Sequence, residues 1–306
     1  MSGSRAKPPR AFFRADDLRR SLAVALDDDG EALVVGVDEA GRGPVFGPMV
    51  YAGAVIDLAD HDRLVEECGV ADSKVLTAGQ RQEALRSLKR LKTFRSFVVV
   101  LTAEEISAAM TGCDGRNLNT LSHDAAITII SRATLAGVGK LCAAYVDTVG
   151  PPESYQSRLS GRFPHLDITV SAKADSKYPI VSAASIIAKT TRDEAIERLG
   201  LDIGSGYPSD PRAARWLRLH VHRFFIVPRW YNFVRYSWGP VAQLGKNPGV
   251  CIQATFKQDE LNEEKKRPKS DLDKGQPKLD FARVPPKRAA IFTHMLMLEP
   301  IQSIDF

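Results

Sequence analysis

The sequence predicts an α/β protein in which a mixed β-sheet is flanked by helices. Short apolar, β-branched runs alternate with segments of helical spacing. The first two such runs are joined by a glycine- and proline-rich turn, which resembles a hairpin with a long connection. Strands that open with a hairpin and then mix with helices are typical of a mixed sheet covered by helices. A chain of 306 residues, 44% hydrophobic and 26% charged, is long enough for one sizeable core.

Each element follows from its local pattern. The runs ALVVGV and MVYAGAVI predict the first two strands, because they are short, apolar and rich in β-branched residues. Apolar side chains on one side predict helices further on, and the last of these is long and rich in small residues. The predicted strands are residues 32–37, 49–56, 94–101, 141–147 and 167–171, and the predicted helices are 80–92, 103–110, 117–136 and 179–199.

Composition divides the chain into three parts. Residues 1–30 are polar and carry Pro and Asp-Gly breakers, so we expect a mobile arm with one helical turn near residues 16–26. Residues 31–245 form the predicted domain, and residues 246–306 form a C-terminal extension. The extension contains a charged linker and ends in an apolar stretch from residue 289. We expect this end to dock, either on the chain's own core or on another chain.

The net positive charge is distributed unevenly along the chain. The formal net charge is +5. Residues 1–20 contribute about +4, residues 257–289 about +3 and residues 290–306 about −2, whereas residues 21–256 are close to neutral. A nucleic-acid cleft must therefore come from local placement of charge and not from the bulk total.

The composition also excludes several classes of protein. It rules out a wholly disordered chain, a collagen-like fibre and a disulfide miniprotein. No apolar run reaches the ~18 residues of a membrane span, and the N-terminus has no signal-peptide pattern, so we expect no membrane partner. The four cysteines show no CxxC pair, which favours structural thiols in a reducing, intracellular compartment.

The first candidate site lies in VGVDEAGRGPVFGP, residues 35–48. A strand delivers Asp38 and Glu39 together, and a turn containing Gly41, Arg42 and Gly43 follows. One interpretation is a strand that simply ends in a solvated turn. The other is functional: the alternation of side chains aims one carboxylate into a cleft, and the glycines let backbone N–H groups approach a phosphate or sugar hydroxyl.

Two further carboxylates lie beside the ends of predicted elements later in the chain. Asp147 ends the predicted strand 141–147 and Asp175 precedes the long helix 179–199. Alternative roles are a helix cap for Asp147 and a favourable charge at the helix N-terminus for Asp175. If all four carboxylates converge, they supply the hard oxygen ligands of a two-metal phosphodiester site.

Other polar and aromatic residues suit contacts with nucleic acid. Along the helix 179–199, Ser182, Ser185, Lys189 and Arg192 share one stripe, which fits either a solvated face or close approach of a phosphate backbone. Tyr207 lies in a Gly-Ser-Gly-Tyr-Pro turn, where it either packs on its neighbours or stacks on a sugar or base. The segment 222–238 interleaves arginines with aromatics and fits a binding surface or an aromatic core.

Six segments in order resemble one family. DEAGRGPVFGPMVYAGAV, ADSKVLT, NLNTLSHDAA, YVDTVGP, AKADSKYPIVSAASIIAK and GSGYPSDP are similar to the catalytic subunits of eukaryotic type 2 ribonucleases H. The resemblance covers about residues 34–238. It implies a ribonuclease H-like fold and endonucleolytic cleavage of RNA in RNA–DNA hybrids and of single ribonucleotides embedded in duplex DNA.

The resemblance also implies roles for individual residues. Four carboxylates would bind two Mg²⁺ or Mn²⁺ ions and direct water to the phosphate 5′ of the ribonucleotide, leaving 3′-hydroxyl and 5′-phosphate ends. The Gly-Arg-Gly turn would sense the 2′-hydroxyl, and Tyr207 would stack on the following deoxyribose. The implied catalytic and metal-binding residues are Asp38, Glu39, Asp147 and Asp175; the implied substrate contacts are Gly41, Arg42, Gly43 and Tyr207, with Asn117, Asn119, Thr148, Ser182 and Lys189 as contacts to backbone or phosphate.

The resemblance finally implies partners and a place of action. The family works as a heterotrimer with two accessory subunits, so we expect the apolar end near residues 291–298 to dock there. Residues 265–269, KKRPK, fit a nuclear-localisation patch or a solvated charge run. We expect a nuclear enzyme that removes ribonucleotides and RNA primers from DNA. The alternative is a non-catalytic nucleic-acid-binding subunit, which would have little reason to keep an intact acidic set.

Overall fold

The computed structural model describes residues 12–21, 32–70, 76–112, 116–137, 140–220 and 231–245. A five-stranded mixed sheet organises them, in the order β3-β2-β1-β4-β5. β1 pairs antiparallel with β2 and parallel with β4, so the predicted hairpin and the mixed sheet are confirmed. The strands are β1 (Leu33–Ala40), β2 (Met49–Asp57), β3 (Arg95–Leu101), β4 (Leu141–Asp147) and β5 (Asp167–Ser171).

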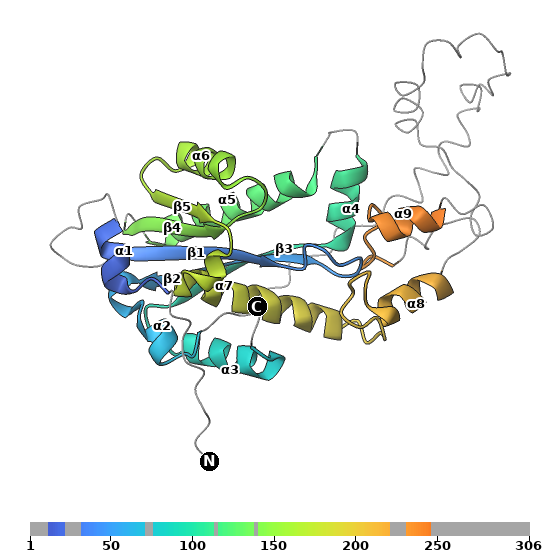
Figure 1. Ribbon diagram of the computed structural model, residues 1–306, viewed down its shortest axis with the longest axis horizontal. Coiled ribbons are helices and arrows are strands. Elements are labelled where there is room, and N and C mark those ends of the chain that lie inside the picture. Colours follow the sequence, from blue (N-terminus) through green and yellow to red (C-terminus); the bar gives the residue numbers. More distant parts are fainter. Residues whose placement is uncertain are drawn as a thin grey trace, which may run out of the picture. The chain divides into compact units, whose positions relative to one another are not determined.

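Helices cover both faces of this sheet (Figure 1). α7 packs on one face together with α2 and α3, while α4, α5 and α6 lie on the other. α8 and α9 build a third apolar cluster beside the β1–β2 connection. The helices are α1 (Ala15–Ser21), α2 (Arg63–Glu66), α3 (Ala78–Leu88), α4 (Ala103–Thr111), α5 (Leu118–Gly137), α6 (Pro152–Arg162), α7 (Pro179–Glu197), α8 (Pro211–Leu219) and α9 (Gly239–Gly245), with short 3₁₀ turns η1 (Leu58–Asp60) and η2 (Ala174–Ser176).

Local sequence signals set several helix starts. Thr77 and Thr102 each begin a helix with a capping box, in which the threonine side chain and the third helical residue satisfy each other's backbone N–H groups. Pro179 opens α7 and Pro211 opens α8, where proline's fixed φ is already helical.

One close approach between layers positions the site. A Cβ atom added to Gly36 in β1 would lie 2.4 Å from the Ile180 backbone in α7. Only glycine therefore allows α7 to lie this near the strand, and α7 brings Ser185 to the side of β1 that carries Asp38. Packing of the first α7 turn thus fixes the wall of the acidic site.

Part of the predicted N-terminal arm packs on the domain, and its predicted helical turn near residues 16–26 overlaps α1; the mobility of the arm stays a prediction. Residues 12–21 lie within the predicted arm, yet Leu18 is buried and Phe13 stacks on Tyr178 with ring centroids 4.9 Å apart. Arg14 also pairs with Glu66 at 3.1 Å. Apolar burial and these contacts hold α1 on the domain. The rest of the arm and the extension 246–306 lie outside the described residues, so their boundaries stay predictions.

Candidate active site

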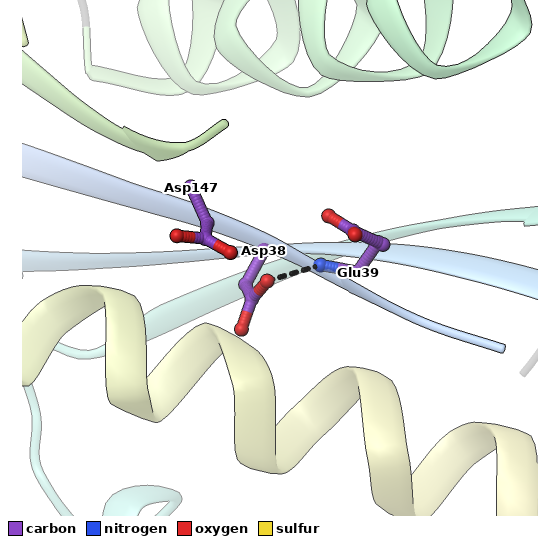
Figure 2. A group of neighbouring side chains, drawn as sticks. All are labelled: Asp38, Glu39 and Asp147. Carbon is purple, nitrogen blue, oxygen red and sulfur yellow. Dashed lines mark hydrogen bonds between the residues drawn. The ribbon is translucent and has the colours of Figure 1, made fainter. Parts of the chain in front are cut away.

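Two adjacent carboxylates leave β1 on opposite faces of the sheet. Side chains alternate along a strand, so Asp38 points toward α7 and Glu39 points to the side covered by α5 and α6 (Figure 2). The Glu39 backbone N–H donates to Asp38 Oδ1 at 2.7 Å. Asp38 is 5% exposed, so one of the two carboxylates is nearly removed from water.

Asp147 completes a group of three. It ends β4, which lies beside β1 in parallel register, and the two strand ends therefore meet at the same edge. Oxygen atoms of Asp38, Glu39 and Asp147 all lie within 4.8 Å of one another. Asp147 does not cap α6, whose N-cap is Pro151; instead its Oδ1 accepts a 2.7 Å hydrogen bond from the Ala174 N–H.

Asp175 lies next to this group without joining it. It sits in η2 and is buried, and Tyr178 occupies the N-cap of α7. Its charge still contributes to raising the pKa of Glu39. The structure thus brings three of the four predicted carboxylates into one group and leaves the fourth as an electrostatic neighbour.

The electrostatics of the group fit a cation. Burial, then the charges of Glu39 and Asp147, raises the pKa of Asp38 well above its usual value. Burial and Asp147 raise the pKa of Glu39 to about 7, although Arg42 opposes the rise. Glu39 Oε2 is buried and has no hydrogen-bond partner among the described residues. Clustered carboxylate oxygens with one orphaned atom are a donor set for a hard divalent ion such as Mg²⁺ or Mn²⁺.

A cleft of about 310 Å³ opens beside Glu39. The turn from residue 41 to residue 43 forms one wall, and Tyr207, which is 40% exposed, forms another. Gly41 has φ +82°, and an added Cβ there would lie 2.6 Å from both Arg192 Cδ and the Pro48 carbonyl oxygen. The lining residues are Glu39, Ala40, Gly41, Arg42, Gly43, Arg81, Lys189, Arg192, Asp193 and Tyr207. Four of these are cationic, so the cleft suits an anionic ligand.

The side chain of Arg42 is tied to α5. Its Nη1 donates to Ser122 Oγ at 2.8 Å, and its Nη2 donates to Asn119 Oδ1. Arg42 therefore turns toward a helix on the Glu39 side of the sheet. The sequence prediction for Asn119 placed it near substrate, and here it positions the arginine of the turn.

Tyr207 is held by Arg192. Arg192 Nη2 donates to the Ser205 carbonyl at 2.7 Å, and the guanidinium carbon lies 5.5 Å from the Tyr207 ring centroid. Asp210 Oδ2 accepts from the Ser205 N–H at 2.8 Å and closes the same loop. One aromatic face is therefore presented by a loop that is fixed at both ends.

Other predicted contacts have different outcomes. Ser182 is completely buried on α7, so this part of the stripe offers no exposed surface, and its contact with a phosphate backbone stays a prediction. Asn117 is exposed and its Oδ1 accepts from the Thr120 N–H at 3.0 Å, as in a helix cap. Thr148 Oγ1 donates to the Gly150 carbonyl at 3.0 Å. Substrate contacts for Asn117 and Thr148 stay predictions, and Lys189 does line the cleft.

Sequence reasoning missed Arg235. This arginine is 0% exposed, and its Nη1 and Nε donate to the carbonyls of Arg42 and Gly47, both at 3.0 Å, while Nη2 donates to that of Gly41. Its guanidinium also lies over Trp238, whose indole N–H donates to the Gly43 carbonyl at 2.9 Å. In its described residues, 231–238, the segment 222–238 packs against the third apolar cluster, with Val234 and Arg235 buried. The alternation of arginines and aromatics was visible in the sequence, but it did not distinguish a core segment from a binding surface.

With this geometry in hand, comparison with known proteins defines the class. A model of the family described as "Ribonuclease HII" matches residues 35–241. The chain therefore belongs to the ribonuclease HII family, and it is a nuclease of the ribonuclease H class. Among the described residues, no helix has the length and hydropathy of a membrane span.

The relatives narrow the resemblance to one kind of subunit. The A-subunit of ribonuclease H2 from Rattus norvegicus is 46% identical over 218 residues, covering 68% of this chain and 71% of the relative. The corresponding Homo sapiens protein is 45% identical over 217 residues, with coverage of 68% and 71%. The resemblance to catalytic subunits of eukaryotic type 2 ribonucleases H is confirmed.

Solved structures confirm the fold. The crystal structure of ribonuclease H2 from Pyrococcus horikoshii OT3 matches with a TM-score of 0.58 and 36% identity, covering 69% of this chain and 96% of that one. Ribonuclease HII of Archaeoglobus fulgidus, solved in a complex with PCNA, matches with a TM-score of 0.57 and 33% identity, covering 74% and 99%.

Proposed function

We propose that this chain is a metal-dependent endonuclease that cleaves RNA in RNA–DNA hybrids and the phosphate 5′ of single ribonucleotides embedded in duplex DNA. The products carry 3′-hydroxyl and 5′-phosphate ends. The observation that carries the proposal is that Asp38, Glu39 and Asp147 form one carboxylate group, and that Glu39 of this group lines a cationic cleft together with the Gly-Arg-Gly turn and Tyr207.

The acidic and the basic residues of the site have different roles. Asp38, Glu39 and Asp147 would hold two Mg²⁺ or Mn²⁺ ions, with the neighbouring Asp175 as the fourth carboxylate of the predicted set. When bound, such ions activate a water molecule and stabilise the leaving oxygen. The cationic side chains lining the cleft attract the nucleic-acid backbone.

Selectivity for ribose comes from the walls of the cleft. At Gly43 the missing side chain leaves room beside the Tyr207 ring, so a sugar edge can approach the turn closely there. A 2′-hydroxyl that satisfies a polar group in this turn favours ribose, because deoxyribose leaves that group unpaired. Tyr207 supplies the flat surface on which the next sugar stacks.

The experiment uses a DNA duplex with one embedded ribonucleotide, Mg²⁺ and the full chain, with and without accessory subunits. An all-DNA duplex and the Asp147→Asn variant are the controls. We expect cleavage 5′ of the ribonucleotide by the wild type and no cleavage in either control, because Asp147→Asn removes a metal ligand but leaves the cleft intact. Turnover by Asp147→Asn, or the absence of wild-type cleavage under both conditions, contradicts the proposal.

We further propose that the enzyme acts in the nucleus, in ribonucleotide and primer removal, within a complex with two accessory subunits. The segments that motivate this, residues 265–269 and 289–306, lie outside the described residues. Deleting residues 290–306 and testing co-purification with both subunits checks the docking role; a complete complex from the truncated chain contradicts it.

A further inference from the structure

Several buried polar atoms behind the acidic site have no hydrogen-bond partner among the described residues. They include Glu39 Oε2, the hydroxyls of Tyr51 and Tyr155, and Nε2 of His123. Most buried polar atoms in folded proteins are paired, so a group of unpaired ones needs an explanation. Tyr51 and Tyr155 belong to the apolar cluster on the Glu39 side of the sheet, and His123 stacks on Tyr155 with centroids 4.0 Å apart. These four unpaired atoms lie on the Glu39 side of the sheet, whereas others, such as Thr190 Oγ1 and Arg192 Nε, lie on the α7 side.

Tyr51 is the member nearest to Glu39. The two residues are direct partners in the antiparallel β1–β2 ladder, so their side chains leave the same face of the sheet side by side. Tyr51 is 1% exposed. A tyrosine hydroxyl can donate one hydrogen bond, so Tyr51 has a donor to offer the carboxylate beside it.

Ser122 connects Tyr51 to the substrate-facing turn. It is completely buried on α5 and accepts the 2.8 Å hydrogen bond from Arg42. Its helix, α5, packs on β2, the strand that carries Tyr51, in the same buried cluster. The order of groups is therefore Glu39, Tyr51, Ser122 and Arg42.

We propose that Tyr51 and Ser122 are positioning residues that join the metal-binding carboxylate Glu39 to Arg42 of the Gly-Arg-Gly turn. The proposal rests on the metal site of the proposed function. Tyr51 donates to Glu39 and holds Oε2 ready for a cation, while Ser122 holds both Tyr51 and Arg42. The carboxylate that binds metal and the turn that faces the sugar are then set by one buried network.

The first test measures metal binding directly in the full chain, by titrating Mn²⁺ and following the free ion by electron paramagnetic resonance. Tyr51→Phe removes only the hydroxyl. We expect it to raise the Kd for Mn²⁺ about 10-fold, the lower end of what loss of a ligand's outer partner costs. Tyr178→Phe is the matched control, because Tyr178 is a buried tyrosine in the cluster on the α7 side. Its Kd should equal that of the wild type.

A double-mutant cycle then tests whether the residues form one network. Ser122→Ala should weaken Mn²⁺ binding less than Tyr51→Phe, and the double variant should weaken it less than the product of the two single effects. Multiplicative effects, or a Tyr51→Phe variant that binds Mn²⁺ like the wild type, overturn the inference and leave the proposed function standing. A wild-type chain that binds no Mn²⁺ overturns both.

Discussion

Arg235 Nη1 donates to the carbonyl oxygen of Arg42 at 3.0 Å, although 193 residues separate them in the sequence. The same guanidinium reaches the carbonyls of Gly41 and Gly47. A turn that is rich in glycine would otherwise have much conformational freedom. The segment after α8 therefore fixes the shape of the turn that faces the cleft.

Replacing Arg235 by lysine should destabilise the protein. Lysine keeps a positive charge but lacks the planar fork that reaches three carbonyls, so buried acceptors lose their donors. We expect a loss of about 2–4 kcal/mol in the free energy of unfolding, measured by urea denaturation. Arg212→Lys, at a site that is 62% exposed, is the control and should change it by less than ~0.5 kcal/mol. Equal effects at the two sites contradict the role of Arg235.

A side chain at Gly41 should damage activity more than stability alone explains. Gly41→Ala places a Cβ atom 2.6 Å from Arg192 Cδ and the Pro48 carbonyl, at a φ of +82°. We expect a loss of about 1–3 kcal/mol in stability and at least ~10-fold in kcat/KM on a single-ribonucleotide duplex. Gly79→Ala, where no atom lies within 4 Å of the added Cβ, should leave kcat/KM unchanged. Wild-type kinetics for Gly41→Ala rule out a tight turn.

Loss of the Tyr207 ring should be selective among substrates. Tyr207→Ala should lower kcat/KM for a single embedded ribonucleotide more than for a long RNA–DNA hybrid, because a single site depends on one stacked sugar. Stacking of one group contributes about 1–3 kcal/mol, so a loss of roughly 10- to 100-fold is expected. Tyr207→Phe keeps the ring and should retain most of the activity. Identical losses on both substrates argue against discrimination by this residue.

The acidic group should make the metal-free protein sensitive to pH. Burial and Asp147 raise the pKa of Glu39 from 4.5 to about 7 on folding, so between these values the native state binds more protons than the unfolded state. Stability then falls as the pH rises through this window. Urea unfolding in EDTA at pH 5 and pH 8 should show that wild type loses about 1–3 kcal/mol more than Glu39→Gln.

Unfolding in the presence of Mg²⁺ tests the same assignment of Glu39. Added at pH 8, it should restore wild-type stability, because an ion that binds only the native state shifts the equilibrium toward it. It should restore the Glu39→Gln variant less. A pH dependence that is the same in both proteins, with and without Mg²⁺, contradicts the assignment of Glu39.

Strong local patterns made much of the fold predictable. β4 and β5 have the predicted bounds, because each is a short apolar run between clear breakers. α8 was not predicted, although its Asp210-Pro211 start is a helix signal that is visible in the sequence. α1 was expected to be mobile, because a polar sequence gives no sign that Leu18 and Phe13 find apolar partners across the chain.

Some residues of the candidate site could be predicted from the sequence and others could not. Asp38, Glu39 and Asp147 were predictable because strand ends in a mixed sheet meet at one edge. The burial of Ser182 was not, because a stripe of small hydroxyls looks alike whether it faces solvent or a sheet. Arg235 and Tyr51 act through long-range pairing, and no local pattern reveals which carbonyl or carboxylate a distant residue will meet.

The central place of β1 bears on how the metal ligands respond to thermal fluctuations. This strand is hydrogen-bonded to β2 on one edge and β4 on the other, and helices cover both its faces. Its amides should therefore be among the slowest of the described chain to exchange with deuterium, opening only when the whole domain unfolds. Asp38 and Glu39 then share the lifetime of the native state, so the carboxylates that would bind metal stay in place for as long as the domain is folded.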